Sequence, residues 1–170
     1  MTKAVWSAVK VAAAVGVFSA LSATTAYAQA TAPGTVNVTV NVAAKAKLTL
    51  GAASLVFADA DPDTTPTLTA PSLSVDVKAR TSSAGSVTLT VLAGGDLING
   101  TANIPVTNLA WTSLGAGFVA GASNKTTAQS VGSWAGSGTR TGTQVYTLPN
   151  SWAYATGTYT VTLNYTLTAP

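Results

Sequence analysis

The sequence predicts an all-β fold, in which a single antiparallel β-sandwich domain follows a secretory signal peptide. Three observations lead to this prediction. Apolar and polar residues alternate over several stretches, turn-forming residues separate these stretches, and no window after the signal peptide repeats with the helical period of about 3.6 residues. Short strands with turn signals about every 8–12 residues are typical of two antiparallel sheets that pack face to face.

Residues 1–28 have the features of a secretory signal peptide. Lys3 and Lys10 give a positive start, residues 11–21 form a short apolar run, and Ala26-Tyr27-Ala28 has the small-x-small pattern of a cleavage site. The apolar run is shorter than the about 20 residues that a membrane-spanning helix needs. We therefore expect a secreted protein, located at the bacterial surface, with 29–35 as a flexible lead-in and 36–170 as the folded domain.

Charged residues make up only 8% of the chain, against about 25% in typical domains. The outer faces must therefore consist mainly of Thr, Ser, Asn and Gly. After the signal peptide the net charge is +1, because the chain has five aspartates and six basic residues. The basic residues are Lys45, Lys47, Lys78, Arg80, Lys125 and Arg140. This balance predicts no basic patch for nucleic acid or anionic lipid, and weak repulsion between copies of the chain.

The residue types exclude most catalytic centres. The chain has no His and no Cys, so it lacks a Ser-His-Asp triad, a thiol nucleophile and the usual zinc ligands. All acidic residues are aspartates, and three of them lie in one predicted loop. We therefore predict a non-enzymatic protein that needs no cofactor.

The first alternating stretch runs from Val36 to Leu50, with apolar residues at every even position. It is longer than an ordinary strand of about 5–6 residues. We expect one long bent strand, or two strands broken near Ala43-Ala44. Its first half is also the kind of segment that completes the sheet of its own molecule or of a neighbouring copy, through Val36, Val38, Val40 and Val42. An ordinary first strand is the simpler alternative.

The middle of the chain predicts two hairpins. Residues 72–80 and 86–91 alternate on either side of a turn at 81–85, so we expect these two runs to pair. Asn99-Gly100 is a type I′ hairpin signal. Residues 104–111 form a further strand, which Pro105 places at an edge or a bulge.

The C-terminal third contains weaker signals and one strong one. Residues 115–122 are Gly-rich and irregular, 126–134 form a weaker strand, 136–142 a flexible turn, and 143–148 a strand. The strong signal is the last stretch, in which Tyr159, Val161, Leu163, Tyr165 and Leu167 alternate with Thr and Asn. It predicts a half-buried strand whose inner row packs against residues 75–79 and 87–91.

Two surface sites are candidates for ligands. Asp59, Asp61 and Asp63 alternate in a loop, and such carboxylates can converge on Ca²⁺. The EF-hand positions for Gly and Glu are Thr64 and Ala70 here, which favours a solvated acidic turn.

The second candidate is an aromatic platform for stacking sugar rings, made by Trp134, Trp152 and Tyr154. Large aromatic side chains in a sandwich more often belong to the core, so burial is the alternative.

The C-terminal run Gly157-Thr-Tyr-Thr-Val-Thr-Leu-Asn-Tyr-Thr-Leu resembles the ending of the WxL family of bacterial cell-surface domains. Residues 75–80 and 86–91 resemble that family's first Trp-x-Leu region, with Val87 and Tyr165 where the two Trp residues stand. The resemblance implies a secreted Ig-like sandwich. The same C-terminal strand is similar to that of fimbrial subunits, which polymerise by donating an N-terminal strand to a neighbour.

We therefore expect a non-enzymatic, structural or adhesive cell-surface protein. One alternative is a filament subunit with residues 34–42 as the donor strand, whose partner is a second copy of the chain. Another is a glycan- or calcium-binding module, whose partner is a cell-wall or surface polysaccharide.

Overall fold

The computed structural model describes residues 30–170, and the predicted signal peptide lies outside them. In this range the regular structure is strand, apart from one 3-10 turn, η1 (Val106–Asn108). All strand pairings are antiparallel. The prediction of an all-β antiparallel fold is confirmed.

Residues 30–170 contain no helix that is long and apolar enough to cross a membrane.

The chain divides into two units, of which the second comprises Val40–Pro170. Residues 30–39 are exposed and have no regular structure, and the same holds for 40–44. The first strand, β1, is Lys45–Leu50. The expectation of strand structure over 36–44 is therefore wrong. A period-two pattern predicts a strand only if a neighbouring strand accepts its backbone hydrogen bonds, and the strands described between residues 30 and 170 include no such neighbour for 36–44.

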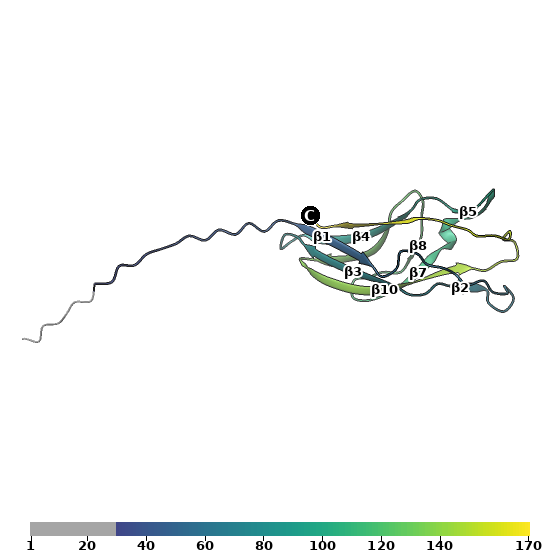
Figure 1. Cartoon of the computed structure of the whole chain (residues 1–170), viewed down its shortest axis with the longest axis horizontal. Helices are drawn as coiled ribbons and strands as arrows, with labels where there is room; N and C mark the ends of the chain where they lie inside the picture. The colour runs from purple at the N-terminus through teal and green to yellow at the C-terminus, as the bar shows by residue number, and fades with distance from the viewer. Residues whose placement is uncertain (1–29) are drawn as a thin grey trace, which may run out of the picture. The chain divides into compact units, whose positions relative to one another are not determined.

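The larger sheet has six strands. Their order is β1-β3-β10-β7-β8, and β2 also pairs with β10. The bounds are β2 (Thr67–Thr69), β3 (Leu73–Arg80), β7 (Ala110–Leu114), β8 (Gly121–Ala122) and β10 (Gly138–Pro149). At 12 residues, β10 spans about 35–40 Å. It pairs with three other strands and so connects the two ends of this sheet (Figure 1).

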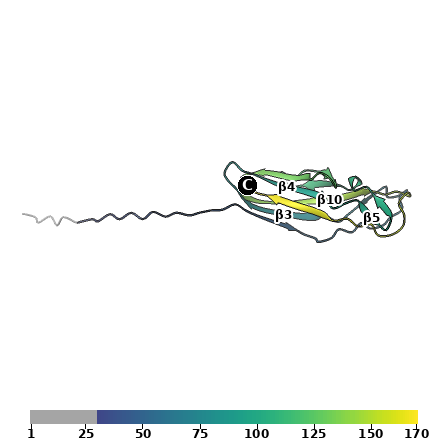
Figure 2. The same cartoon turned by 90° about the horizontal axis from the view of Figure 1, so that it is seen from above.

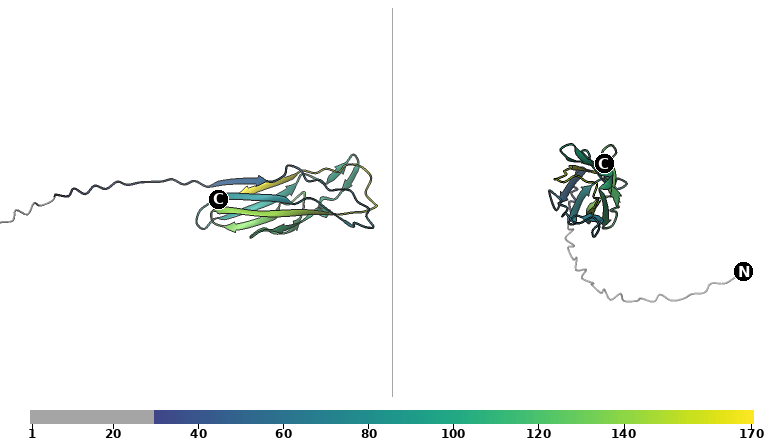
Figure 3. Two further views of the ribbon diagram at one scale, coloured as in Figure 1. Left: turned by 60° about the horizontal axis from the view of Figure 1, so that its bottom comes forward. Right: turned by 90° about the vertical axis from the view of Figure 1, so that its right-hand side faces the viewer.

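The second sheet has the order β11-β4-β9, with β4 (Ser86–Ala93) between β9 (Gln129–Ala135) and β11 (Leu163–Thr168). Pairing between β4 and β9 shifts register at Leu89/Thr90. A small hairpin, β5 (Leu97–Asn99) and β6 (Ala102–Ile104), forms a third sheet. The strands of the two larger sheets run along the same long direction (Figure 3).

Both larger sheets contribute to one apolar core. The even residues of β10 from Gln144 to Leu148 and alternate residues of β3 and β4 are buried, while the residues between them are more exposed. Figure 2 shows β3 and β4 on opposite sides of the domain. The fully buried members include Val75, Val77, Leu89, Val91, Trp111, Val131 and Tyr146. The predicted packing of 75–79 and 87–91 into the core with the C-terminal row is confirmed.

The expected hairpin between 72–80 and 86–91 is wrong, because β3 and β4 belong to different sheets. The connection at residues 81–85 carries the chain from one side of the core to the other. Strands β3 and β4 then bury their apolar rows from opposite sides of the core, whereas the two strands of a hairpin would bury theirs from the same side. The predicted turn at 136–142 is likewise shorter, since β10 already begins at Gly138 and pairs with β3.

The Asn99-Gly100 signal correctly predicts a hairpin. Asn99 pairs with Ala102, and Gly100 supplies the positive φ of 58° in the connection. The single strand expected over 104–111 is interrupted, because β6 ends at Ile104 and Pro105 leads into η1 before β7 begins at Ala110. Proline has no N–H to donate to a sheet, so it stands between the two strands.

We predict that Leu89→Ala destabilises the domain by about 2–5 kcal/mol, because Leu89 is fully buried between the sheets. Urea unfolding followed by tryptophan fluorescence measures the change as a lower midpoint at constant slope. Thr112→Ala, at an exposed position of β7, is the matched control and should remain within about 0.5 kcal/mol of the parent. Equal midpoints for the two variants would contradict this assignment of the core.

Candidate functional site

The acidic loop does not gather its carboxylates around a point. Within residues 30–170, no three Asp, Glu, His or Cys side chains form a group that could hold a metal ion. Asp61 Oδ1 accepts the Asp63 N–H at 2.9 Å, and Asp63 Oδ1 accepts the Trp152 indole N–H at 3.1 Å. The carboxylates of Asp61 and Asp63 thus shape the loop and hold an aromatic side chain, and Asp59 is exposed. This arrangement does not favour the calcium hypothesis.

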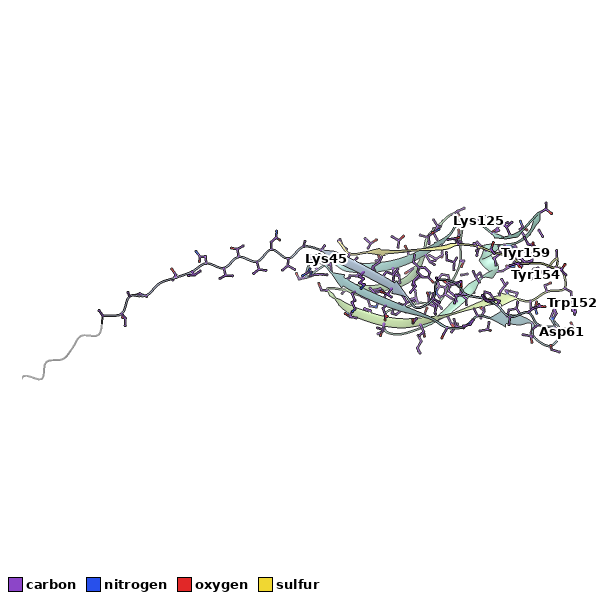
Figure 4. The ribbon with its side chains drawn as sticks, in the orientation of Figure 1. Lys45, Asp61, Lys125, Trp152, Tyr154 and Tyr159 are labelled. Atoms are coloured by element: carbon purple, nitrogen blue, oxygen red, sulfur yellow. The ribbon has the colours of Figure 1, made fainter. Side chains whose placement is uncertain are left out.

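The three aromatic residues of the glycan hypothesis do not form one platform. Trp134 is only 7% exposed, its ring meets Phe118 edge-on at 4.8 Å, and its indole N–H donates to Ala116 O. Tyr154 is half-buried against the core. Only Trp152 is well exposed, at 71%. Figure 4 shows Trp152 beside Asp61 at one end of the strands, with Tyr154 nearby.

A row of exposed apolar side chains occupies the segment that was expected to begin the first strand. Val36, Val38, Val40 and Val42 expose 87%, 82%, 75% and 58% of their surface. Single exposed apolar residues are ordinary, but several in one row form a candidate binding surface. The described residues offer this row no partner strand.

The second feature is an open seam between the two sheets. Strands β1 and β11 are edge strands of different sheets and lie next to each other without pairing. Their core-facing residues are only half-buried, unlike the fully buried rows of β3 and β4. We define the open seam as β1 and β11 with these residues, which are Leu48, Leu50, Leu163, Tyr165 and Leu167.

The C-terminal segment is held along one edge only. β11 pairs with β4 from Leu163 to Thr168, and just before it Thr160 exchanges two backbone hydrogen bonds with Ile98. After β11, the Thr81 hydroxyl donates to the carbonyl of Pro170. The other edge of β11 has no sheet neighbour among residues 30–170. Its outward N–H and C=O groups therefore make no sheet hydrogen bonds, although β1 of the other sheet lies beside part of this edge.

A buried hydrogen-bond chain fixes β11 to the opposite sheet. The Tyr165 hydroxyl donates to Gln144 Oε1 at 2.6 Å. The Tyr146 hydroxyl lies 2.5 Å from the Tyr165 hydroxyl. Because the proton of Tyr165 is already used, Tyr146 is the donor in this second hydrogen bond. Gln144 is fully buried, and its Nε2 has no hydrogen-bond partner among the described residues. The signal for this feature is a glutamine in the inner row of β10, which the sequence reasoning did not use.

Burial raises the pKa of both tyrosines above the ordinary value of 10.0. For Tyr165 the neighbouring Tyr146 raises the pKa further, whereas for Tyr146 the hydrogen bond with Tyr165 lowers it and partly opposes burial. Both hydroxyls are therefore neutral at physiological pH and serve as hydrogen-bonding groups.

No protein-family model matches this sequence, and no curated protein shows a significant match to it.

We predict that the hydrogen-bond chain makes the domain sensitive to alkali. A tyrosine with a raised pKa in the folded state stabilises the fold fully below pH 10, and this contribution is lost as the pH rises further. Each such tyrosine contributes a slope of up to about 1.4 kcal/mol per pH unit. Tyr165→Phe should be about 1–3 kcal/mol less stable at neutral pH, because Gln144 Oε1 loses its donor, and should unfold less steeply with pH.

Urea unfolding between about pH 9 and pH 11 checks this. Tyr159→Phe is the control, since its hydroxyl bonds only to Ala155 O in an exposed loop. An alkaline slope for Tyr165→Phe as steep as that of the parent would contradict the assignment.

Proposed function

We propose that this chain is a non-enzymatic, secreted structural protein of the cell surface, with an Ig-like β-sandwich fold, and that its copies assemble by strand addition. The observation that carries the proposal is the exposed row Val36, Val38, Val40 and Val42. The two antiparallel sheets with a shared core support the sandwich. The resemblance of the C-terminal strand to WxL domains and fimbrial subunits supports the surface location.

The row is well suited to add a strand to another molecule. It alternates apolar and polar residues, as a half-buried strand does, and each valine that becomes fully buried contributes about 1.5–3 kcal/mol. The open seam offers the matching surface, because β11 has a free edge and a half-buried apolar row of the same period. In β-strand addition, backbone hydrogen bonds give affinity and alternate side chains give specificity.

The occupant of the open seam is a second copy rather than the same chain. Only Ala43 and Ala44 separate Val42 from the start of β1. To fold back onto the free edge of β1, the chain would have to turn within these two residues. Two-residue hairpin turns require residues that adopt positive φ, such as Asn-Gly or Gly-X, and Ala-Ala is not of this kind. The sequence therefore disfavours a hairpin between the row and β1 of its own molecule.

We predict that Val38→Ser with Val40→Ser abolishes assembly and leaves the domain folded, because both positions lie outside the core. Negative-stain electron microscopy and light scattering of the chain without residues 1–28 measure fibres and mass. The control is Asn37→Ser with Thr39→Ser, which changes the alternate face of the same segment and should still assemble. The proposal is refuted if the parent protein stays monomeric at high concentration. It is also refuted if the Val38→Ser/Val40→Ser variant assembles as well as the parent.

A further inference from the structure

Strand register gathers basic residues that are separated in the sequence. In the pairing of β1 with β3, Lys45 lies opposite Arg80 and Lys47 lies opposite Lys78. All four side chains are exposed, and they line a shallow depression of about 370 Å³ with Gly138 and Thr139 of β10. We call these four residues the basic end. The expectation of no basic patch for nucleic acid or anionic lipid rested on the net charge, which does not show how strand register gathers these four cations.

The basic end is costly for an isolated domain. Like charges directly opposite each other on neighbouring strands destabilise a sheet, by roughly 0.2–1 kcal/mol for each pair. None of the four forms a salt bridge among residues 30–170, where the only one joins Lys125 to Asp96 at 2.6 Å, and the one carboxylate on the same face of β3 is Asp76, two positions from Lys78. Two such pairs side by side, in a chain with so few charges, indicate a surface that receives an anionic partner.

The opposite end of the strands carries the complementary charge. Asn150, directly after β10, donates from Nδ2 to Ala60 O and Thr65 O and so anchors the loop that contains the aspartates. Gly138, at the other end of β10, lines the same depression as the basic end. The two ends are therefore separated by about the length of β10, roughly 35–40 Å. Figure 4 shows Lys45 and Asp61 at these opposite ends.

We propose that the acidic end of one copy, made of Asp59, Asp61, Asp63 and Trp152, docks on the basic end of the next copy. Charge complementarity selects this occupant, because the same chain presents both halves of the contact. Trp152 is exposed and held by Asp63, so its ring is placed to meet a cation such as Arg80 of the second copy. A head-to-tail contact between different surfaces does not close on itself and gives the assembly a direction.

This inference deepens the proposed function, because it rests on assembly of copies and names the contact that orients them. It is nevertheless separable from strand addition. The strand row supplies apolar burial, whereas the charged ends supply attraction that salt screens and that speeds the encounter.

The experiment uses the Val38→Ser/Val40→Ser chain without residues 1–28, in which strand addition is disabled. An acid-neutral variant carries Asp59→Asn, Asp61→Asn and Asp63→Asn, and the amide oxygens keep the acceptors used by the loop and by Trp152. A base-neutral variant carries Lys45→Gln, Lys47→Gln, Lys78→Gln and Arg80→Gln. The control, Asp96→Asn with Lys125→Gln, removes one charge of each sign at the salt bridge that neither end uses.

Sedimentation velocity should show reversible self-association of the parent and control at about 0.01 M salt and at least about tenfold weaker association at 1 M, where the Debye length falls from about 30 Å to about 3 Å. Each neutral variant alone should remain monomeric. A mixture of the two should form a one-to-one complex that grows no further, since only one basic and one acidic end remain.

Self-association of either neutral variant, or a mixture that stays monomeric, overturns the inference. Binding of polygalacturonate to the basic end without association of copies also overturns it, in favour of an acidic polysaccharide. The charge changes can also be placed in chains that keep Val38 and Val40. If these chains form fibres at an unchanged rate, the docking contact is refuted and strand addition stands. If the copies associate in a salt-sensitive way but form no fibres, strand addition is refuted and the docking contact stands.

Discussion

The domain depends on an apolar core that side chains from two sheets bury jointly, while the edges of those sheets remain unpaired on one side. β10 and β3 bury their inner rows against β4, and burial there is complete. At β1 and β11 the same alternation continues, but burial is only partial. The open seam and the exposed valine row therefore follow from a single constraint. Two packed sheets whose edge strands do not pair leave hydrogen-bonding groups and apolar side chains without a sheet partner.

The sequence predicted those features that are local. Period-two alternation correctly located the core-facing rows of β3, β4 and β11, because neighbouring residues on a strand must face opposite sides. The pattern failed where the choice of pairing strand determines the structure. Residues 36–44 have the pattern of a strand but no neighbour among the described strands. The runs that contain β3 and β4 look like a hairpin but belong to different sheets. Which strand a segment pairs with is set by contacts far along the chain, which composition and period do not contain.

The candidate sites show the same division. The acidic loop and the exposed Trp152 are visible in the sequence, yet the hydrogen bond that joins them links Asp63 to a residue far along the chain. The basic end was invisible, because its members come from two segments that only register brings together. Trp134 looked like a ligand-binding aromatic but packs edge-on against Phe118, since the Gly-rich segment before β8 covers it. Burial, rather than residue type, separates these two tryptophans.

The buried hydrogen-bond chain also has a consequence for how the last strand finds its place. If β11 slipped by one residue along β4, its threonines and Asn164 would face the core and Tyr165 would face solvent. Gln144 would then be left in the core without the hydroxyl that now bonds to it. The polar group thus acts as a check on alignment, because a misplaced C-terminal strand loses both its apolar packing and this bond.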